Sequence, residues 1–163
     1  MSVRPYRTED LPIIVEIADK AYENIKTVIR LTVGDEVADV LNPDGDHITK
    51  GKQMEYVATH APESLFVCER KGKIVGFIQF LMHDDIDRPI GEIGNNGVDP
   101  DCGEKGVGQE MYQAVFDHMK ACGKKMVYVT TGLDYAHAPA RRAYRRAGFK
   151  NEQLSVTYYR MLD

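Results

Sequence analysis

A glycine-rich loop between a strand and a helix is the part of this sequence best suited to binding a ligand. Residues 92–112 read Glu-Ile-Gly-Asn-Asn-Gly-Val-Asp-Pro-Asp-Cys-Gly-Glu-Lys-Gly-Val-Gly-Gln-Glu-Met-Tyr. Because Gly103, Gly106 and Gly108 lack Cβ atoms, successive backbone N–H groups can turn toward one point. The helix that follows adds free N–H groups and the positive end of its dipole. We therefore expect an anion, most simply a phosphate group, to bind here.

The strand before this loop has an unusual composition. Its second half contains a run of weak strand formers, Gly94, Asn95, Asn96 and Gly97. A strand kept only for packing would carry branched side chains at these positions. Glycine inside a strand often marks a bulge, or a place where a ligand comes close to the backbone. The strand is therefore expected to belong to the same site as the loop.

Two common phosphate-binding loops do not fit. A P-loop needs Gly-x-x-x-x-Gly-Lys-Ser/Thr, whereas Gly108 is followed by Gln109 and Glu110. A dinucleotide-binding loop needs Gly-x-Gly-x-x-Gly, whereas the pair Gly106 and Gly108 continues to Met111. That loop also opens a βαβ unit, and an antiparallel meander is predicted here instead. The pattern therefore favours neither class.

The composition limits the classes of function. The chain of 163 residues suits one domain, residues 1–163, large enough to need no disulfide or metal. A net charge of −4 argues against nucleic acid as the main partner. Neither an apolar leader nor an apolar run of about 18 residues is present, so no signal peptide or membrane span is expected. Three cysteines without metal-ligand spacing predict reduced thiols in a cytoplasmic protein that binds no metal.

Hydrophobic periodicity predicts helices on both sides of an antiparallel meander. Helices are expected at residues 11–29, 34–41, 47–60, 106–121 and 139–147. Strands are expected at residues 3–6, 64–69, 73–81, 89–98, 126–131 and 154–161. This order brings the glycine loop to the junction between the third strand of the meander and a long amphipathic helix.

Two motifs resemble those of the GNAT superfamily of acyl-CoA-dependent N-acyltransferases. The first is Val98-Asp-Pro-x-x-Gly103-x-x-Gly106-x-Gly108. The second is Ala140-x-x-x-Tyr144-x-x-x-Gly148-Phe149, which leads from a helix into the final strand. The order of elements also fits over nearly the whole chain. The resemblance implies an α/β (α+β) fold with a mixed, mostly antiparallel sheet of about six or seven strands, flanked by helices and containing a splayed central pair.

The resemblance also implies acetyl-CoA as cosubstrate, with its pyrophosphate at the glycine loop. The residues that it assigns to the cofactor are Val98, Gly103, Lys105, Gly106, Val107, Gly108, Gln109, His137, Ala140 and Tyr144. Gly103 stands where the family commonly has Arg or Gln, which leaves only a backbone contact. His137 stands where Asn is common, and it could contact the cofactor, relay a proton or cap a helix.

Two side chains resemble the family's catalytic groups for direct attack of an amine in a ternary complex. Glu92 is the candidate base, and the alternative is a solvated polar position on a half-exposed strand. Tyr144 is the candidate acid for the CoA thiolate, and the alternative is aromatic packing. The N–H near Val98 is the candidate oxyanion donor. Tyr128 and Tyr158 lack such a setting and are interpreted as packing residues.

The acceptor is not identified by the sequence. Acidic residues gather in segments that usually build the acceptor pocket of this fold: Asp35, Glu36, Asp39, Asp44, Asp46, Asp84, Asp85 and Asp87. They favour a cationic small-molecule amine, or simply solubility. The leading hypothesis is N-acetylation of a primary amine. The alternatives are an acyl-CoA-binding sensor module and a peptide or protein N-terminal acetyltransferase. A homodimer through the last strand is also expected.

Overall fold

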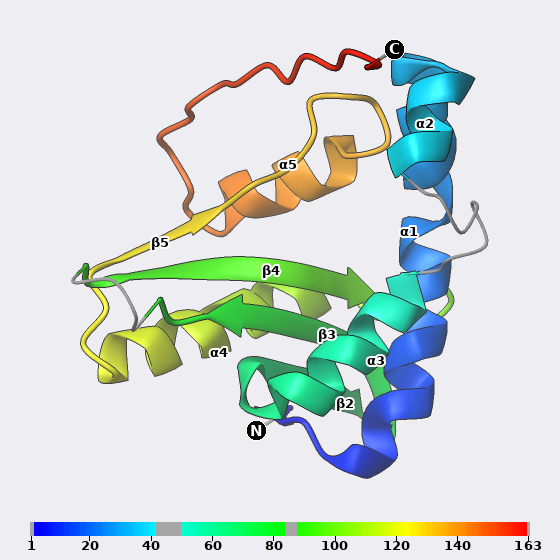
Figure 1. Cartoon of the computed structure of the whole chain (residues 1–163). Coiled ribbons are helices and arrows are strands. Elements are labelled where there is room, and N and C mark those ends of the chain that lie inside the picture. Colours follow the sequence, from blue (N-terminus) through cyan, green and yellow to red (C-terminus); the bar gives the residue numbers. More distant parts are fainter. Residues whose placement is uncertain (1, 42–49, 84–87, 163) are drawn as a thin grey trace.

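The structure is a computed structural model that describes residues 2–41, 50–83 and 88–162. Five strands within these ranges form one sheet in the order β1-β2-β3-β4-β5. They are β1 (Val3–Pro5), β2 (Leu65–Arg70), β3 (Lys73–Leu81), β4 (Ile90–Val98) and β5 (Met126–Val129). The first four pair antiparallel, and β5 pairs parallel to β4 (Figure 1). The expected mixed, mostly antiparallel sheet is confirmed.

Helices cover both faces of the sheet. They are α1 (Leu11–Val33), α2 (Asp35–Leu41), α3 (Lys50–His60), α4 (Val107–Ala121) and α5 (Ala138–Arg146). In Figure 1, α1 and α3 lie together on one side of the meander, and α4 runs along the other. Across the described ranges, no helix combines the length and the apolar character that crossing a membrane requires.

The sheet is buried on both faces because its central strands alternate between two cores. Phe77 of β3 joins a cluster with residues of α1 and α3, among them Ile14 and Met54. Its neighbours Ile78 and Phe80 join the larger cluster built around α4 and α5. This alternation fixes the register of the meander, since a shift by one residue would exchange the two faces.

The expected bulge lies in β4. Ile93 pairs with Phe80 of β3, and Asn96 pairs with Ile78. Two residues of β4, at positions 94 and 95, therefore face the one residue of β3 between Ile78 and Phe80. The backbone N–H and side-chain Nδ2 of Asn95 both donate to the Oε1 of that residue, Gln79. The weak strand formers of the sequence thus correspond to a real irregularity in the ladder.

The C-terminal segment differs from expectation. Residues 154–161, expected to form a last strand, have no regular secondary structure and are mostly exposed. The described sheet consequently has five strands instead of six or seven. A strand needs an edge to pair with, and this segment runs past α5 away from the sheet (Figure 1). The start of the helix expected at 47–60 and the acidic positions Asp44, Asp46, Asp84, Asp85 and Asp87 lie outside the described residues.

A buried carboxylate joins β1 to α1. Asp10 is only 4% exposed, and its two carboxylate oxygens accept hydrogen bonds from the Arg4 guanidinium at 2.8 and 2.9 Å. The Arg7 N–H also donates to this carboxylate at 2.8 Å. Burial raises the pKa of Asp10, but the hydrogen bonds from Arg4 and Arg7 outweigh it and hold the pKa below its usual value. The charged form of Asp10 therefore stabilises the fold.

We expect Asp10→Asn to lower the free energy of unfolding by about 2 kcal/mol at pH 7, because charge-assisted hydrogen bonds are lost. Since the folded pKa is depressed, this stabilisation is present above the unfolded pKa of about 3.9 and disappears as pH falls through the folded value. Urea unfolding of both proteins between pH 3 and pH 7 measures this. A difference that does not shrink toward pH 3 would contradict the assignment.

Candidate active site

The site begins where β4 and β5 part. The two strands pair only from Ile90 to Ile93 of β4 and from Met126 to Val129 of β5. β5 ends there, whereas β4 continues to Val98. The remaining residues of β4 therefore have no strand beside them on this side in the described part of the chain. The helix α4 connects β4 to the parallel strand β5, so its N-terminus lies at the C-terminal end of β4. This end of the strands is the usual position for ligands in such arrangements.

The open side of β4 presents backbone hydrogen-bonding groups. The Asp99 N–H donates to the Val75 carbonyl, so residue 99 faces β3. Asn96 faces the other way, because its C=O accepts from the Tyr22 hydroxyl at 3.0 Å and its N–H donates to the same hydroxyl at 3.2 Å. Residues of an antiparallel strand alternate in this respect. The N–H of Val98 is therefore directed into the gap, two residues beyond Asn96.

A cavity of about 400 Å³ lies at this gap and brings several predicted residues together. Its lining includes Glu92, His137, Ala140 and Tyr144, all of which the sequence singled out. It also includes residues 93–96 of β4, residues 130 and 131 after β5, and Tyr22 of α1. Val98 and the glycine loop are not among the lining residues and belong to the adjoining end of the sheet. One cavity thus joins the two candidate catalytic side chains.

The Tyr144 hydroxyl is held by a network that the sequence analysis missed. Asn96 Nδ2 donates to this hydroxyl at 3.2 Å, and the Tyr112 hydroxyl donates to Asn96 Oδ1 at 2.9 Å. Tyr144 is 8% exposed, and burial raises its pKa despite the hydrogen bonds from Asn96 and Tyr112. The phenol therefore stays protonated at neutral pH. Because it accepts from Asn96, its own proton remains available to a third group.

Glu92 belongs to a second polar cluster, where the first residues of β4 pair with β5. Glu92 lies opposite Tyr128 of β5, whose hydroxyl donates to Glu92 Oε2 at 2.7 Å. His83 Nε2 lies 2.9 Å from the same oxygen and 3.2 Å from the Tyr128 hydroxyl. The hydrogen bond to Glu92 raises the pKa of Tyr128. Interpreting Tyr128 as a packing residue was therefore wrong, and Tyr158, which is 90% exposed, does not pack within one chain either.

His137 lies at the start of α5 and is bound to Asp134. Its backbone N–H donates to Asp134 Oδ1 at 3.1 Å, and its ring Nδ1 lies 2.6 Å from Asp134 Oδ2. Burial raises the pKa of Asp134, but the hydrogen bonds from His137 outweigh it and lower that pKa. The pair fixes the orientation of the imidazole at the cavity. Within the described ranges, no three His, Cys, Asp or Glu side chains are arranged to hold a metal ion.

The glycine loop has the backbone that the sequence suggested. Gly103 and Gly106 have φ angles of 66° and 81°, in the left-handed region that favours glycine. Gly106 caps α4, so the first N–H groups of the helix lack intrahelical partners. Val107 is 1% exposed, which leaves its N–H but not its side chain for a ligand.

The Gln109 side chain donates to the Ala143 carbonyl at 3.0 Å and so ties α4 to α5. Lys105 is exposed beside these groups.

Four further residues complete the site, and few signals in the sequence pointed to them. Tyr22 lies on the face of α1 that meets the sheet, and its periodicity would have suited a packing residue equally well. Asn96 was noticed only as a weak strand former. The contacts of His83 and Tyr128 with Glu92 follow from strand register, which a single sequence does not encode locally.

Comparisons with known proteins agree with this geometry. The mycothiol acetyltransferase of Thermomonospora curvata is 34% identical over 97 residues, which are 60% of this chain and 31% of that protein. The chain spans about a third of the length of such curated relatives.

Two solved structures share the fold at 20% identity. One is a GNAT family acetyltransferase from Brucella melitensis in complex with acetyl-CoA, with a TM-score of 0.57 over 91% of this chain and 82% of that one. The other is an aminoglycoside acetyltransferase from an uncultured soil metagenomic sample in complex with sisomicin, with a TM-score of 0.56 over 99% and 95%. The model of the acetyltransferase (GNAT) family matches residues 34–149, well over half of the sequence. The chain belongs to this family.

Proposed function

We propose that this protein transfers the acetyl group of acetyl-CoA to a primary amine by direct attack in a ternary complex. The observation that carries the proposal is the cavity at the parted strands, which Glu92 and Tyr144 both line. The Glu92 carboxylate can accept a proton and is held in place by hydrogen bonds. Tyr144 is a neutral phenol that can donate a proton. Membership of the acetyltransferase (GNAT) family supports the same reaction class.

The chain offers groups that suit each part of the cosubstrate. An extended pantetheine arm can pair with the open side of β4 in the manner of an added strand. A pyrophosphate suits the N-terminus of α4, where Gly106 ends the loop and free N–H groups point outward. Lys105 supplies positive charge beside the pyrophosphate. Because Gly103 has no side chain, its backbone can come close to the phosphate oxygens. These groups require no metal ion.

The residues of the site then divide the chemistry. Glu92 accepts the proton of the ammonium group, and His83 and Tyr128 hold its carboxylate in place. The N–H of Val98 donates to the thioester oxygen as negative charge develops there. When the carbon–sulfur bond breaks, Tyr144 donates its proton to the thiolate, while Asn96 keeps its hydroxyl oriented. As the amide forms, the attacking nitrogen loses its second proton, which restores the neutral Tyr144 through solvent. The proton on Glu92 then passes to water, so the products are the amide, CoA thiol and one proton.

The acceptor is proposed to be a small molecule that carries a primary amine. The carboxylate of Glu92 lines the cavity, and a cation suits it. The wider acidic surface contributes less than its sequence suggests, because Asp35 and Asp39 both pair with Arg30, at 3.0 and 2.9 Å. A mycothiol acetyltransferase and an aminoglycoside acetyltransferase among the similar proteins are consistent with small-molecule acceptors.

Wild-type protein is expected to bind acetyl-CoA and CoA in calorimetry and to acetylate a member of a mixed amine and peptide panel, read by mass spectrometry. We expect Tyr144→Phe to keep CoA affinity and lose about 100-fold in turnover, the usual contribution of a general acid. Tyr135→Phe, at an exposed tyrosine, is the control. Absence of CoA binding to the wild type would reject the proposal, and unchanged turnover in Tyr144→Phe would remove this residue from the mechanism.

For Glu92→Gln we expect a loss of about 100-fold near pH 7, with a deficit that grows as pH falls. An alkyl amine has a pKa of about 10, so the neutral fraction available to a variant without a base falls tenfold per pH unit. Turnover of both proteins from pH 6 to pH 10 measures this. Parallel pH profiles would show that Glu92 is not the base.

Gly106→Ala tests the anion site, and Gly123→Ala is its matched control. Both glycines have φ of 81°, an added Cβ would meet open space at each, and they flank opposite ends of α4. Each substitution is expected to cost about 1 kcal/mol of stability through backbone strain. Only Gly106→Ala is expected to weaken CoA binding, by about tenfold. Equal CoA affinity in the two variants would place the phosphates elsewhere.

A further inference from the structure

The outer edge of β5 is open. β5 pairs with β4 along one edge, and in the described part of the chain no strand pairs with the other. Its outward backbone N–H and C=O groups are therefore free to accept another strand. An unpaired edge of this kind is a template for pairing with another chain, and natural proteins normally cover it.

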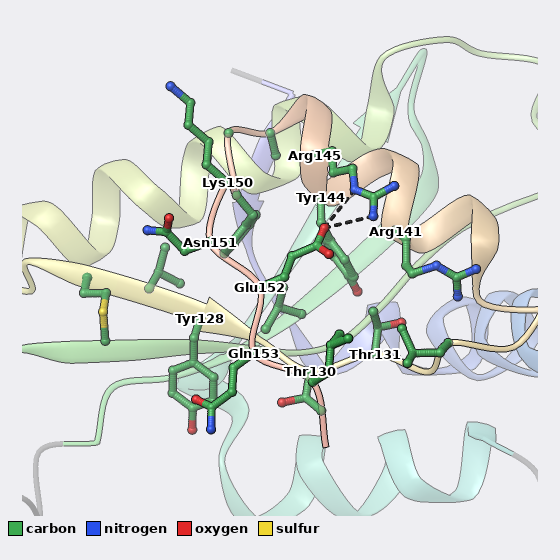
Figure 2. Close-up of a pocket in the computed structure, with 18 of the residues that line it drawn as sticks. Tyr128, Thr130, Thr131, Arg141, Tyr144, Arg145, Lys150, Asn151, Glu152 and Gln153 are labelled. Carbon is green, nitrogen blue, oxygen red and sulfur yellow. Dashed lines mark hydrogen bonds and ion pairs between the residues drawn. The ribbon is translucent and has the colours of Figure 1, made fainter. Parts of the chain in front are cut away.

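A cavity of about 700 Å³ runs beside this edge. On one side it is lined by β5, with Val127 and Val129 also packing against the large core. Its other lining includes the apolar side chains of Phe116 and Phe149, and residues 150–155 of the C-terminal segment form the far wall. Figure 2 shows these wall residues passing α5 and β5 without joining the sheet. The cavity between β5 and the C-terminal segment therefore lies where one further strand could pair with β5.

The end of the chain has the pattern of that strand. In residues 154–162, Leu154, Val156, Tyr158 and Leu162 share one face of an extended segment, which Arg160 interrupts. Their exposed fractions are 68, 75, 90 and 89%. So many exposed apolar side chains in one row indicate a surface that is covered in the working protein. This segment lies beyond the part that the family model matches, which ends at residue 149.

The same chain is poorly arranged to fill its own cavity. Residues 150–155 already form the outer wall, and an ion pair of 2.9 Å between Arg145 and Glu152 fixes them to α5 (Figure 2). To enter the space, the chain would have to reverse after Ser155. Residues 154–162 contain no Gly, Pro, Asn or Asp, and Ser155 is the one residue among them of a type that tight turns favour. Figure 1 shows the segment continuing past α5 toward the far end of the molecule.

We propose that residues 154–162 of a second copy occupy this cavity and pair with the outer edge of β5, and that the exchange is reciprocal in a two-fold dimer. Exchange of identical segments is a low-cost route to dimers, since each contact is one that the chain can make. Backbone hydrogen bonds would hold the inserted segment to β5, and its apolar row would face Phe116 and Phe149. Tyr144 and residues 130 and 131 line both cavities, so the inserted strand also closes one side of the candidate active site.

Tyr158→Asp tests the proposal against Tyr56→Asp, a matched control at an exposed tyrosine of α3. Native mass spectrometry and light scattering are expected to give two copies for the wild type and for Tyr56→Asp. Tyr158→Asp is expected to raise the dimer dissociation constant by about tenfold or more, without changing the circular dichroism spectrum. A monomeric wild type, or equal dissociation constants for both variants, would overturn the proposal.

Disulfide trapping identifies the chain that fills the cavity. In a Cys102→Ser, Cys122→Ser background, one tagged copy carries Met126→Cys on β5, and a differently tagged copy carries Val156→Cys or Tyr158→Cys. Co-expressed copies are expected to yield a disulfide-linked heterodimer that retains both tags under non-reducing conditions. A disulfide that forms only within a single chain, when both cysteines are placed there, would show that the segment folds back and would overturn the exchange. Failure to link in either arrangement would overturn it as well.

Discussion

The parting of β4 from β5 is the constraint on which the rest of this structure depends. A strand can bind a ligand through its backbone only if its hydrogen-bonding groups are exposed, and exposed backbone groups are costly unless something satisfies them. Here β5 ends at Val129 while β4 runs on to Val98. The bulge opposite Gln79 then turns the last residues of β4 relative to the first ones. Together these two irregularities open a polar gap beside central strands that are buried on both faces.

One asparagine joins this gap to three helices. The backbone of Asn96 bonds to Tyr22 of α1, and its side chain bonds to Tyr112 of α4 and Tyr144 of α5. Burial raises the pKa of all three tyrosines, in Tyr22 to about 12. They therefore act as neutral hydrogen-bonding groups, and the network orients Tyr144 without placing a charge beside it. A site built in this way is rigid, because each of its members is held by a different element.

The short length of β5 has consequences on both of its edges. Toward β4 it opens the gap that holds the candidate catalytic groups. On its outer edge it leaves the space that the C-terminal segment of a second copy is proposed to fill. Thr130, Thr131 and Tyr144 line the cavities on both sides. Assembly and catalysis would therefore be coupled through the same few residues, and the candidate site would be enclosed fully only in the dimer.

The sequence by itself determined the local features of this protein. Periodicity predicted the meander and the long helix after it, glycine placement predicted the loop in which Gly103 and Gly106 adopt left-handed φ angles, and the run of weak strand formers indicated the bulge. These features depend on the conformational preferences of neighbouring residues, so a single sequence encodes them. The resemblance to the acyltransferase motifs supplied the family, which the family model confirmed by matching residues 34–149.

Only the tertiary structure decided which side chains meet. Glu92 contacts Tyr128 because of the register between β4 and β5, and Asn96 contacts Tyr144 because α5 returns over the end of the sheet. Residues 154–161 have the pattern of a strand, but in one chain they run past the open edge of β5 without pairing with it, so their sequence predicted an element that a single copy does not form. Strand pairing is a property of two segments and their geometry, and propensity along one segment cannot determine it.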